Sequence, residues 1–482
     1  MSALARKPEN IRNIIKDYSV DYGVFELCFY KDRKPVYVYI DDRFILDSSG
    51  CPLYAHSRKK KISWVSVIEK GYAKFLGSYE ELNFSTCLKS FVDFTGGVVA
   101  RVNLRDDPKD STKDFKKVYS LLEESWYMCA CTRTKVDEKI LSKIHTYTVL
   151  GIYKTPNNGP TLVKLRDPLP PRKRGDEPLC LNPADLERIG STTRKEIGYD
   201  AAKKSNMQFF MRFEYFCKNF ETVMACCYIP SNFKCVSIHG AWTEGSMGGS
   251  IKSAAWGENP QYVVTVTEDT KVFIVVSQKK RGLMKIGLWA YSLEGREASR
   301  IVSPHNGSED GWGKPIHKED YTDAQEVGFS IDVKKGKLPL VVIPALEKDS
   351  QPGEFSMNVY AKESSHPAIE AVKEWKFCKV VEEKSWACKR EYIIRTHSPF
   401  CSQEQNLHFV VRAVGTRKND EGIYPRVEGN GYVMKGDEGH PVIACKLTAN
   451  SEYTVSLKSK EPKYSGKYKI IVCSNECEFD LS

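Results

Sequence analysis

YGVFELCFY at residues 22–30 and VYVYIDDRF at residues 36–44 are the stretches that decide the fold of the first part of the chain. Apolar and aromatic side chains recur in both at about every second position, which is the period of a β-strand that buries one face. A short, mostly charged segment at 31–35 separates them. We therefore expect two paired strands.

A series of short motifs follows these strands. His56-Ser57, EKGYAKFLGSYEEL at 69–82 and FVDFTGG at 91–97 come after the DDR of the second strand. Each motif is weak by itself, but their order and spacing resemble the protease core of the calpain family. That family carries a VDDR-type strand end, an HS pair, an EKAYAK run with GSYE, and a DFTGG turn. The resemblance implies a papain-like cysteine protease core.

Later motifs of the family locate candidate site residues. HTYTVLG at 145–151 resembles the GHAYSV segment, which puts His145 at the position of the catalytic histidine. LRDP at 165–168 resembles RNPWG, which puts Asp167 at the position of the catalytic asparagine. SNMQFFMRFEYF at 205–216 resembles the strand and helix that close the core.

The catalytic cysteine is the family residue that the resemblance does not place. In calpains it lies in a Q-x-x-x-x-D-C-W-like stretch upstream of the VDDR segment. Residues 1–21 contain no cysteine, and we expect them to be an N-terminal remnant or tail. Residues 22–230 are then the histidine- and asparagine-bearing part of the core. A papain-like site needs a thiolate beside an imidazolium, so the expected nucleophilic cysteine is absent.

Three other cysteines come early enough in the chain to be considered as substitutes. Cys28 is expected in a strand and Cys51 in a turn. Cys87 is expected near a helix start, where the helix dipole could lower its pKa. None has the sequence context of the family, so we interpret all three as structural thiols.

The surroundings of the candidate pair also depart from the family's pattern. Ile144 stands in place of the glycine before the histidine, and Leu169 in place of the tryptophan that shields the pair. An aspartate can orient a histidine as an asparagine does, so Asp167 alone would be tolerated. We interpret the protein as a pseudoprotease in which His145 and Asp167 are vestigial and no catalytic residue is functional.

The calcium positions of the family have changed as well. Lys204, Asn206 and Gln208 occupy them, and a lysine and neutral amides are poor partners for a hard dication. The loop after 165–168 reads PPRKRGDE and is basic at its start. We therefore expect degenerate calcium positions, no other metal and no cofactor.

The second part of the sequence has the pattern of an all-β region. GAWTEGSMGGSIKSAAWGENPQYVVTV at 240–266 resembles the stretch that begins the C2-like β-sandwich of calpains. Short alternating runs between turn residues then predict a first sandwich at 235–362 and a second at 386–482. Residues 363–385 are expected to be a linker with a short helix around Ile369–Trp375. The fold class is thus α+β, then all-β, and the arrangement is similar to the PalB-like, or calpain-seven-like, branch of the family.

The composition is that of a folded chain of several domains, with 482 residues and 41% hydrophobic residues. The N-terminus lacks the apolar core of a signal peptide, and no apolar run approaches a membrane span. Sixteen cysteines without a secretory signal are expected to be reduced thiols. We therefore expect a cytoplasmic protein with no transmembrane segment.

The chain is moderately basic, with a net charge of 72 − 62 = +10. Part of this charge is concentrated in RKKK at 58–61 and RKR at 172–174. A solvated loop is the plain interpretation of such a run. The functional interpretation is contact with an acidic partner such as tubulin or an anionic membrane. No nucleic-acid-binding motif accompanies the charge.

Two functions from different classes remain. The first is a calpain-like protein without the catalytic cysteine half that acts as a scaffold or assembly component, with the microtubules of a cilium or flagellum as a candidate surface. The second is a calcium-independent, calpain-type intracellular cysteine endopeptidase whose cysteine-bearing half is supplied by a missing upstream segment or a partner chain. The first is favoured, because catalysis requires a complete set of site residues.

Overall fold

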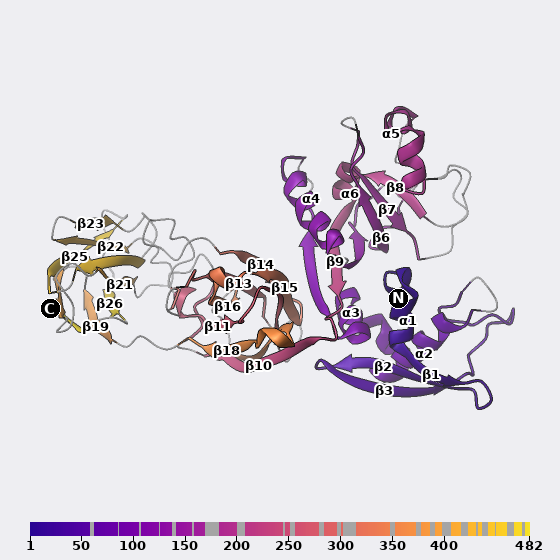
Figure 1. The fold of residues 1–482 in the computed structure, drawn as a ribbon, viewed down its shortest axis with the longest axis horizontal. Helices are drawn as coiled ribbons and strands as arrows, with labels where there is room; N and C mark the ends of the chain where they lie inside the picture. Colours follow the sequence, from indigo (N-terminus) through magenta and orange to yellow (C-terminus); the bar gives the residue numbers. More distant parts are fainter. Residues whose placement is uncertain are drawn as a thin grey trace. The chain divides into compact units, whose positions relative to one another are not determined.

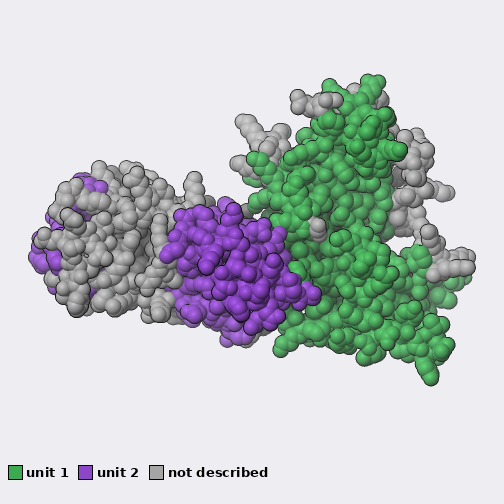
Figure 2. All heavy atoms as spheres, viewed as in Figure 1, with its two compact units in different colours: residues 1–230 green, residues 231–482 purple. Residues whose placement is uncertain are grey.

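The computed structural model divides the chain into two compact units, residues 1–230 and 231–482 (Figure 2). Figure 1 shows the helices and strands of each unit. The structure describes residues 1–57, 62–84, 86–105, 108–124, 126–136, 141–156, 159–168, 183–199, 208–243, 246–250, 256–278, 284–295, 300–301, 315–347, 352–372, 377–385, 391–397, 406–415, 423–429, 432–435, 442–448, 450–459, 467–474 and 478–482.

The first unit contains a three-stranded antiparallel sheet on which two helices pack. The strands, in spatial order, are β1 (Ile15–Ser19), β2 (Val24–Lys31) and β3 (Lys34–Asp41). The helices are α2 (Trp64–Leu76) and α3 (Cys87–Thr95), with the short helix η2 (Glu80–Phe84) between them in sequence. Phe29 of β2 is fully buried against Tyr72 of α2 and Phe94 of α3. The pairing of β2 with β3 confirms the strand pair predicted from residues 22–44.

The N-terminal residues belong to this fold. They form η1 (Leu4–Arg6) and α1 (Pro8–Ile14), and β1 follows directly. Leu4 and Ile14 are fully buried in the core that β2 and α2 also line. The expectation that residues 1–21 form a tail is therefore wrong, because their apolar side chains fill part of the core.

The turn at the end of α3 explains why the sequence FVDFTGG needs both of its glycines. Gly96 ends the helix with φ +60°, a left-handed conformation that glycine adopts without strain. A Cβ atom on Gly97 would lie 2.2 Å from the carbonyl oxygen of Cys227. Arg33 Nη1 donates to the carbonyls of both glycines, at 3.2 and 3.1 Å, and so links the β2–β3 turn to α3.

A six-stranded antiparallel sheet forms the rest of the first unit, in the order β4-β9-β5-β6-β7-β8. Its strands are β4 (Val98–Asn103), β5 (Tyr127–Thr132), β6 (Thr146–Tyr153), β7 (Leu162–Arg166), β8 (Gln208–Arg212) and β9 (Phe220–Cys227). The accompanying helices are α4 (Pro108–Glu123), α5 (Pro183–Glu196) and α6 (Phe213–Asn219). The described residues of 205–216 form β8 and the start of α6, which confirms the strand and helix predicted there.

The second unit begins with two sheets that share one core. The four-stranded sheet has the order β10-β17-β12-β15, with β10 (Phe233–Trp242), β12 (Thr270–Gln278), β15 (Glu326–Val333) and β17 (Gly353–Lys362). The five-stranded sheet has the order β14-β13-β16-β11-β18, with β11 (Tyr262–Thr265), β13 (Ile286–Ser292), β14 (His317–Thr322), β16 (Leu340–Leu346) and β18 (Ala368–Ala371). Short helices η3 (Trp256–Glu258), η4 (Lys335–Lys337) and η5 (Glu363–Ser365) lie between strands in sequence. Trp242 and Phe355 of the first sheet are buried with Leu288 and Val342 of the second.

The remaining strands repeat this arrangement. One sheet has the order β19-β26-β21-β24, with β19 (Phe377–Ser385), β21 (Asn406–Gly415), β24 (Val442–Thr448) and β26 (Lys467–Ser474). The other has the order β23-β22-β25-β20-β27, with β20 (Glu391–His397), β22 (Ile423–Gly429), β23 (Tyr432–Lys435), β25 (Glu452–Ser459) and β27 (Glu478–Leu481). Each strand label is nine higher than that of its counterpart in the first set. Phe409 and Ile470 are buried with Tyr392 and Val455, so these two sheets also share a core.

The segment expected to be a linker, residues 363–385, contains strands instead. β18 pairs with β11, and β19 pairs with β26. The predicted helix around Ile369–Trp375 is wrong at its described residues 369–371, which belong to β18. Ile369 lies opposite Val264 and packs against the core. Both strands lie at a sheet edge, where charged residues are common, and this explains why their Glu- and Lys-rich sequence resembles a linker.

Candidate functional site

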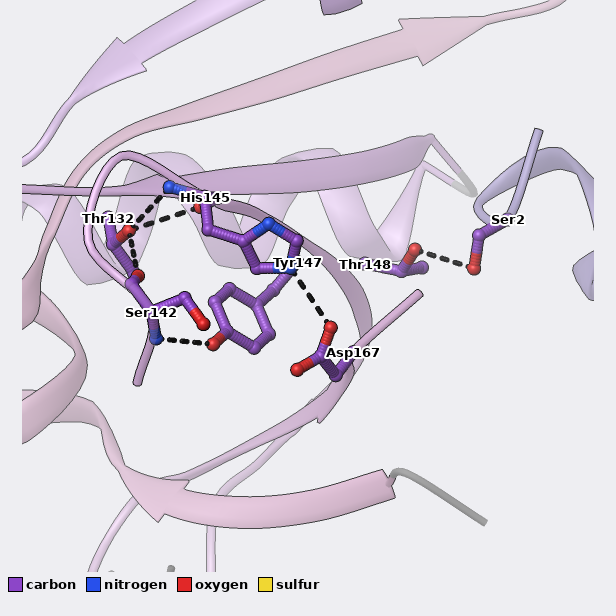
Figure 3. A network of polar contacts seen from close by, with 7 residues as sticks. All are labelled: Ser2, Thr132, Ser142, His145, Tyr147, Thr148 and Asp167. Atoms are coloured by element: carbon purple, nitrogen blue, oxygen red, sulfur yellow. Dashed lines mark hydrogen bonds and ion pairs between the residues drawn. The ribbon is translucent and has the colours of Figure 1, made fainter. Parts of the chain in front are cut away.

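The two candidate site residues come together at the ends of neighbouring strands. His145 directly precedes β6, and Asp167 directly follows β7, which pairs antiparallel with β6. Their side chains meet, with His145 Nε2 2.9 Å from Asp167 Oδ1 (Figure 3). The side chains are 17% and 18% exposed, so the pair is largely shielded from water.

A second set of contacts fixes the backbone around His145. Thr132 Oγ1 accepts a hydrogen bond from the backbone N–H of His145 at 2.9 Å and donates to the carbonyl of Ser142 at 2.7 Å. The hydroxyl oxygen of Tyr147 accepts from the N–H of Ser142 at 2.9 Å. The Tyr147 ring also contacts the imidazole edge-on, with ring centroids 4.7 Å apart. These side chains hold the histidine loop against the sheet (Figure 3).

Ile144 has an unusual backbone conformation. Its φ is +48°, in the left-handed region that β-branched residues avoid, and its side chain is 69% exposed. This is the position at which the resemblance expects a glycine. The loop therefore keeps a backbone shape suited to glycine, although the residue has changed.

The geometry of the pair assigns a role to each imidazole nitrogen. An ionised carboxylate only accepts hydrogen bonds, so Nε2 carries the proton that Asp167 accepts. In the neutral imidazole, Nδ1 then keeps its lone pair and can accept a proton from a third group. Such an arrangement orients the ring and would stabilise an imidazolium if one formed. It supplies a base and its orienting residue, which are two of the parts that nucleophilic catalysis needs.

The third part, a thiol next to the imidazole, is not found among the residues that the structure describes. There the His145 ring contacts Asp167 and Tyr147, and no cysteine hydrogen-bonds to it. Cys131 of β5 comes near His145 in the pairing of β5 with β6, but it lies directly opposite Thr146. Because side chains alternate along a strand, Cys131 shares the face of Thr146, and Tyr147 is on the other face. Burial raises the pKa of the Cys131 thiol and keeps it protonated.

Two of the three cysteines that the sequence suggested as substitutes are also poor nucleophiles, and the third, Cys51, is half-buried between the bridged residues Leu46 and Pro52. Cys87 is the first residue of α3, as expected, but its pKa is raised, first by its hydrogen bond to Cys129 and then by burial. The lowered pKa that a helix start could give is therefore not found at Cys87, in agreement with its interpretation as a structural thiol. Cys28 lies in β2, where burial raises its pKa. Neither thiol has the ionised form that attacks a carbonyl.

Several predicted features lie outside the described residues, including Leu169, Lys204 and Asn206 and both basic segments, 58–61 and 172–174. Gln208 is described and is the first residue of β8. Within the described ranges, no group of three or more His, Cys, Asp or Glu side chains could hold a metal ion. No helix in the same ranges is long and apolar enough to cross a membrane.

Thr132, Ser142 and Tyr147 are further residues of the site, and none of them belongs to the site positions predicted from the sequence motifs. Tyr147 could have been found from its spacing, because a residue two positions after His145 lies on the same face of a strand. Thr132 and Ser142 carry no such signal, since their contacts depend on the pairing of β5 with β6.

Two family profiles match the sequence. The profile described as calpain family cysteine protease matches residues 1–227, and that of calpain large subunit, domain III, matches residues 238–360. Only residues 228–237 separate the two matched regions, and β10 begins within them.

Individual proteins with similar sequences carry the same family name. Calpain-8 of Mus musculus is 26% identical in an alignment of length 393 that covers 71% of this chain and 53% of that protein. Calpain clp-1 of Caenorhabditis elegans is 23% identical in an alignment of length 381 that covers 70% of this chain and 47% of that protein. Calpain-type cysteine protease ADL1 of Oryza sativa subsp. japonica is 24% identical in an alignment of length 392 that covers 75% of this chain and 17% of that protein. The chain thus spans about half the length of the animal relatives and less of the rice protein.

Proposed function

Because the chain belongs to the calpain family, with a protease core followed by a C2-like domain III, we propose that it acts as a non-catalytic scaffold or assembly component. The observation that carries this proposal is the composition of the His145 site. Its described residues supply a base and an orienting carboxylate, but no thiol beside them. Function follows the site and not the fold, so a protease fold with this site is better suited to binding than to cleavage.

Residues around the pair support the same proposal. Ile144 replaces a glycine at a left-handed position, and the sequence has Leu169 where calpains have a shielding tryptophan. A working site would be expected to keep residues that position and shield the base. His145 and Asp167 then act mainly as a buried polar contact that holds the ends of β6 and β7 together.

The second unit provides surfaces for assembly. Its two strand sets have the same order, and each pair of sheets encloses a core of its own. This repetition supports the proposal of two tandem C2-like sandwiches, with the first near 235–362 and the second near 386–482, revised so that β18 and β19 are included. Tandem sandwiches of this kind fit the PalB-like, or calpain-seven-like, branch of the family.

The proposed partner is an acidic intracellular surface, either a cytoskeletal one such as tubulin or an anionic membrane. The support is the net charge of +10 and the two basic segments, 58–61 and 172–174. A contact of this kind weakens as salt rises, since the Debye length falls from about 10 Å at 0.1 M to about 3 Å at 1 M. The site of action would then be the cytoplasm, at microtubules or at a cilium or flagellum.

Co-sedimentation tests the proposed partner. Wild type should pellet with microtubules at low salt. Reversal of six of the seven charges of the basic segments should abolish this pelleting; the reversed residues are Lys59, Lys60, Lys61, Arg172, Lys173 and Arg174. A matched control reverses six exposed lysines elsewhere in the chain, namely Lys31, Lys34, Lys116, Lys117, Lys218 and Lys234. The control should still pellet. Equal loss of pelleting in both variants would mean that binding depends only on net charge. Pelleting with anionic vesicles and not with microtubules would identify a membrane as the partner.

A second candidate function is favoured by one observation. His145 and Asp167 keep a short, shielded hydrogen bond that leaves Nδ1 available as a base. A cysteine supplied by a partner chain or by a segment outside residues 1–482 would complete a calpain-type endopeptidase. A fusion that adds a Q-x-x-x-x-D-C-W-bearing segment before Met1 tests this. Peptide cleavage that disappears in His145→Ala would establish the second function, and an inactive but folded fusion would count against a cysteine supplied within the same chain.

A further inference from the structure

Two cysteines of the second unit lie side by side on neighbouring strands. Cys378 of β19 is directly opposite Cys473 of β26 in antiparallel register. Their Sγ atoms are 2.8 Å apart and share a hydrogen bond, and both cysteines are in the reduced form. Directly opposed residues in antiparallel strands have Cα atoms about 4.5–5.5 Å apart. That spacing falls within the range of about 4.4–6.8 Å that a disulfide requires.

The two thiols differ in their access to solvent. Val472 and Ile470 of β26 face the core, so Cys473 lies on the opposite face of the sheet. Cys378 shares that face, and Val380, two residues further along β19, is 55% exposed. Cys378 itself is exposed, whereas Cys473 is only 4% exposed. A small reagent in solution therefore reaches Cys378 first.

The contact between the thiols also makes Cys378 reactive. The hydrogen bond from Cys473 lowers the pKa of Cys378 to about 7, and it outweighs partial burial, which acts in the opposite direction. A large fraction of Cys378 is then thiolate near neutral pH. The thiolate is the form that attacks electrophiles and oxidants.

We propose that Cys378 and Cys473 are an oxidant-sensitive pair that hydrogen peroxide converts into a reversible disulfide. The Cys378 thiolate attacks one peroxide oxygen, the O–O bond breaks, and a sulfenic acid and hydroxide form. Cys473 then loses its proton and attacks the sulfenic sulfur, so the S–S bond forms and the S–O bond breaks. The released hydroxides take up protons. Two thiols lose two electrons in total, and one peroxide is reduced to two waters.

The bond would join an edge strand to its sheet. β19 is the outermost strand of the sheet β19-β26-β21-β24, and it pairs with β26 alone in that sheet. Cys378 and Cys473 are 95 residues apart in sequence, so the disulfide would close a long loop. Closing a long loop restricts the unfolded chain and stabilises the folded state. Oxidation would therefore fix β19 in place, and a thiol reductant would release it.

Other cysteines of the described chain serve as internal comparisons. Cys235 is exposed, as Cys378 is, but its side chain contacts Ser237 and Asn358 and no second thiol. Cys129 has a thiol neighbour in Cys87, but it is buried in the core of the first unit. Only the pair on β19 and β26 combines, among the described cysteines, an exposed thiol with a hydrogen-bonded thiol partner.

The test is peptide mapping by mass spectrometry on the full chain after treatment with a small excess of hydrogen peroxide. Free thiols are blocked with N-ethylmaleimide before digestion. Wild type should lose two of its sixteen thiols and give one linked peptide that joins Cys378 to Cys473. Dithiothreitol should restore both thiols. Oxidised wild type should also unfold at a temperature higher by roughly 10 °C.

Variants separate the proposed steps. Cys473→Ala should leave Cys378 as a sulfenic acid that dimedone traps, and Cys378→Ser should abolish both the linked peptide and the thermal shift. Cys378 is exposed, so its serine variant should fold even if the alanine at buried Cys473 does not. Cys235→Ser should behave like wild type. A linked peptide that joins other cysteines, a disulfide between two chains, or an unaltered wild type would overturn the proposal.

Discussion

Replacing Ile144 by glycine should stabilise the first unit relative to replacing it by alanine. Both changes remove the mostly exposed atoms beyond Cβ, so the two variants differ only in the Cβ atom and in the backbone conformations that it restricts. At φ +48° a residue with a Cβ costs about 1–2 kcal/mol, and glycine avoids this cost. Glycine also gains freedom in the unfolded chain, which costs about 0.4–1 kcal/mol. The glycine variant should therefore be more stable by about 0.5–1 kcal/mol.

The assay is urea unfolding of the full chain, with calorimetry to identify the transition of residues 1–230. For a unit of this size, about 2–4 °C in melting temperature correspond to 1 kcal/mol, so the two variants should differ by about 1–4 °C. Tyr147 and Thr132 hold the loop from both sides, so the strained conformation should persist in the alanine variant.

A matched control makes the sign of this difference informative. Lys116 is exposed in the interior of α4, where φ is negative, and there glycine should be less stable than alanine by about 0.5–1 kcal/mol. The difference in stability between the glycine and the alanine variant should therefore have opposite signs at the two sites. An alanine variant at position 144 that is as stable as the glycine variant, or more so, would refute the left-handed conformation of this loop.

Three further predictions concern the site, calcium and the thiol pair. Asp167→Ala should lower the free energy of unfolding by about 1–3 kcal/mol in urea titrations, because it leaves the shielded His145 Nε2 without its acceptor. Asp167→Asn should lower it less, and equal losses in the two variants would contradict this role of Asp167. The melting temperature of the full chain should not change with millimolar calcium, and a steady rise would show binding to the native state. Alkylation of Cys378 by iodoacetamide, followed by mass spectrometry, should slow as pH falls through about 7, because the reactive thiolate is lost below its pKa. Cys473→Ala should move that midpoint upward, and an unchanged midpoint would show that the hydrogen bond is not its cause.

Much of the first unit could be predicted because its signals are local. The alternating strands β2 and β3, the glycine turn after α3 and the positions of His145 and Asp167 all follow from short motifs. The family match to residues 1–227 agrees with that prediction. The burial of residues 1–21 could not be predicted, because nothing in a short polar-rich segment shows that Leu4 and Ile14 complete a core formed by later residues.

Features that depend on distant pairing could not be predicted in the same way. The charged sequence of β19 favours a loop until its partner β26 is known, about a hundred residues further along the chain. The contact of Cys378 with Cys473 depends on that register and has no sequence motif. Thr132 likewise reaches the backbone of His145 only because β5 and β6 pair, and the contacts of Ser142 with Thr132 and Tyr147 depend on the same pairing.

The central proposal is that this member of the calpain family does not act as a cysteine protease on its own. The most direct measurement is labelling of the purified full chain with an epoxide probe for papain-like enzymes, with and without calcium, followed by mass spectrometry of all sixteen cysteines. We expect no cysteine whose labelling depends on His145, so that wild type and His145→Ala give the same pattern. Stoichiometric labelling of one cysteine in wild type that is lost in His145→Ala would contradict the account and establish a working thiol–imidazole pair.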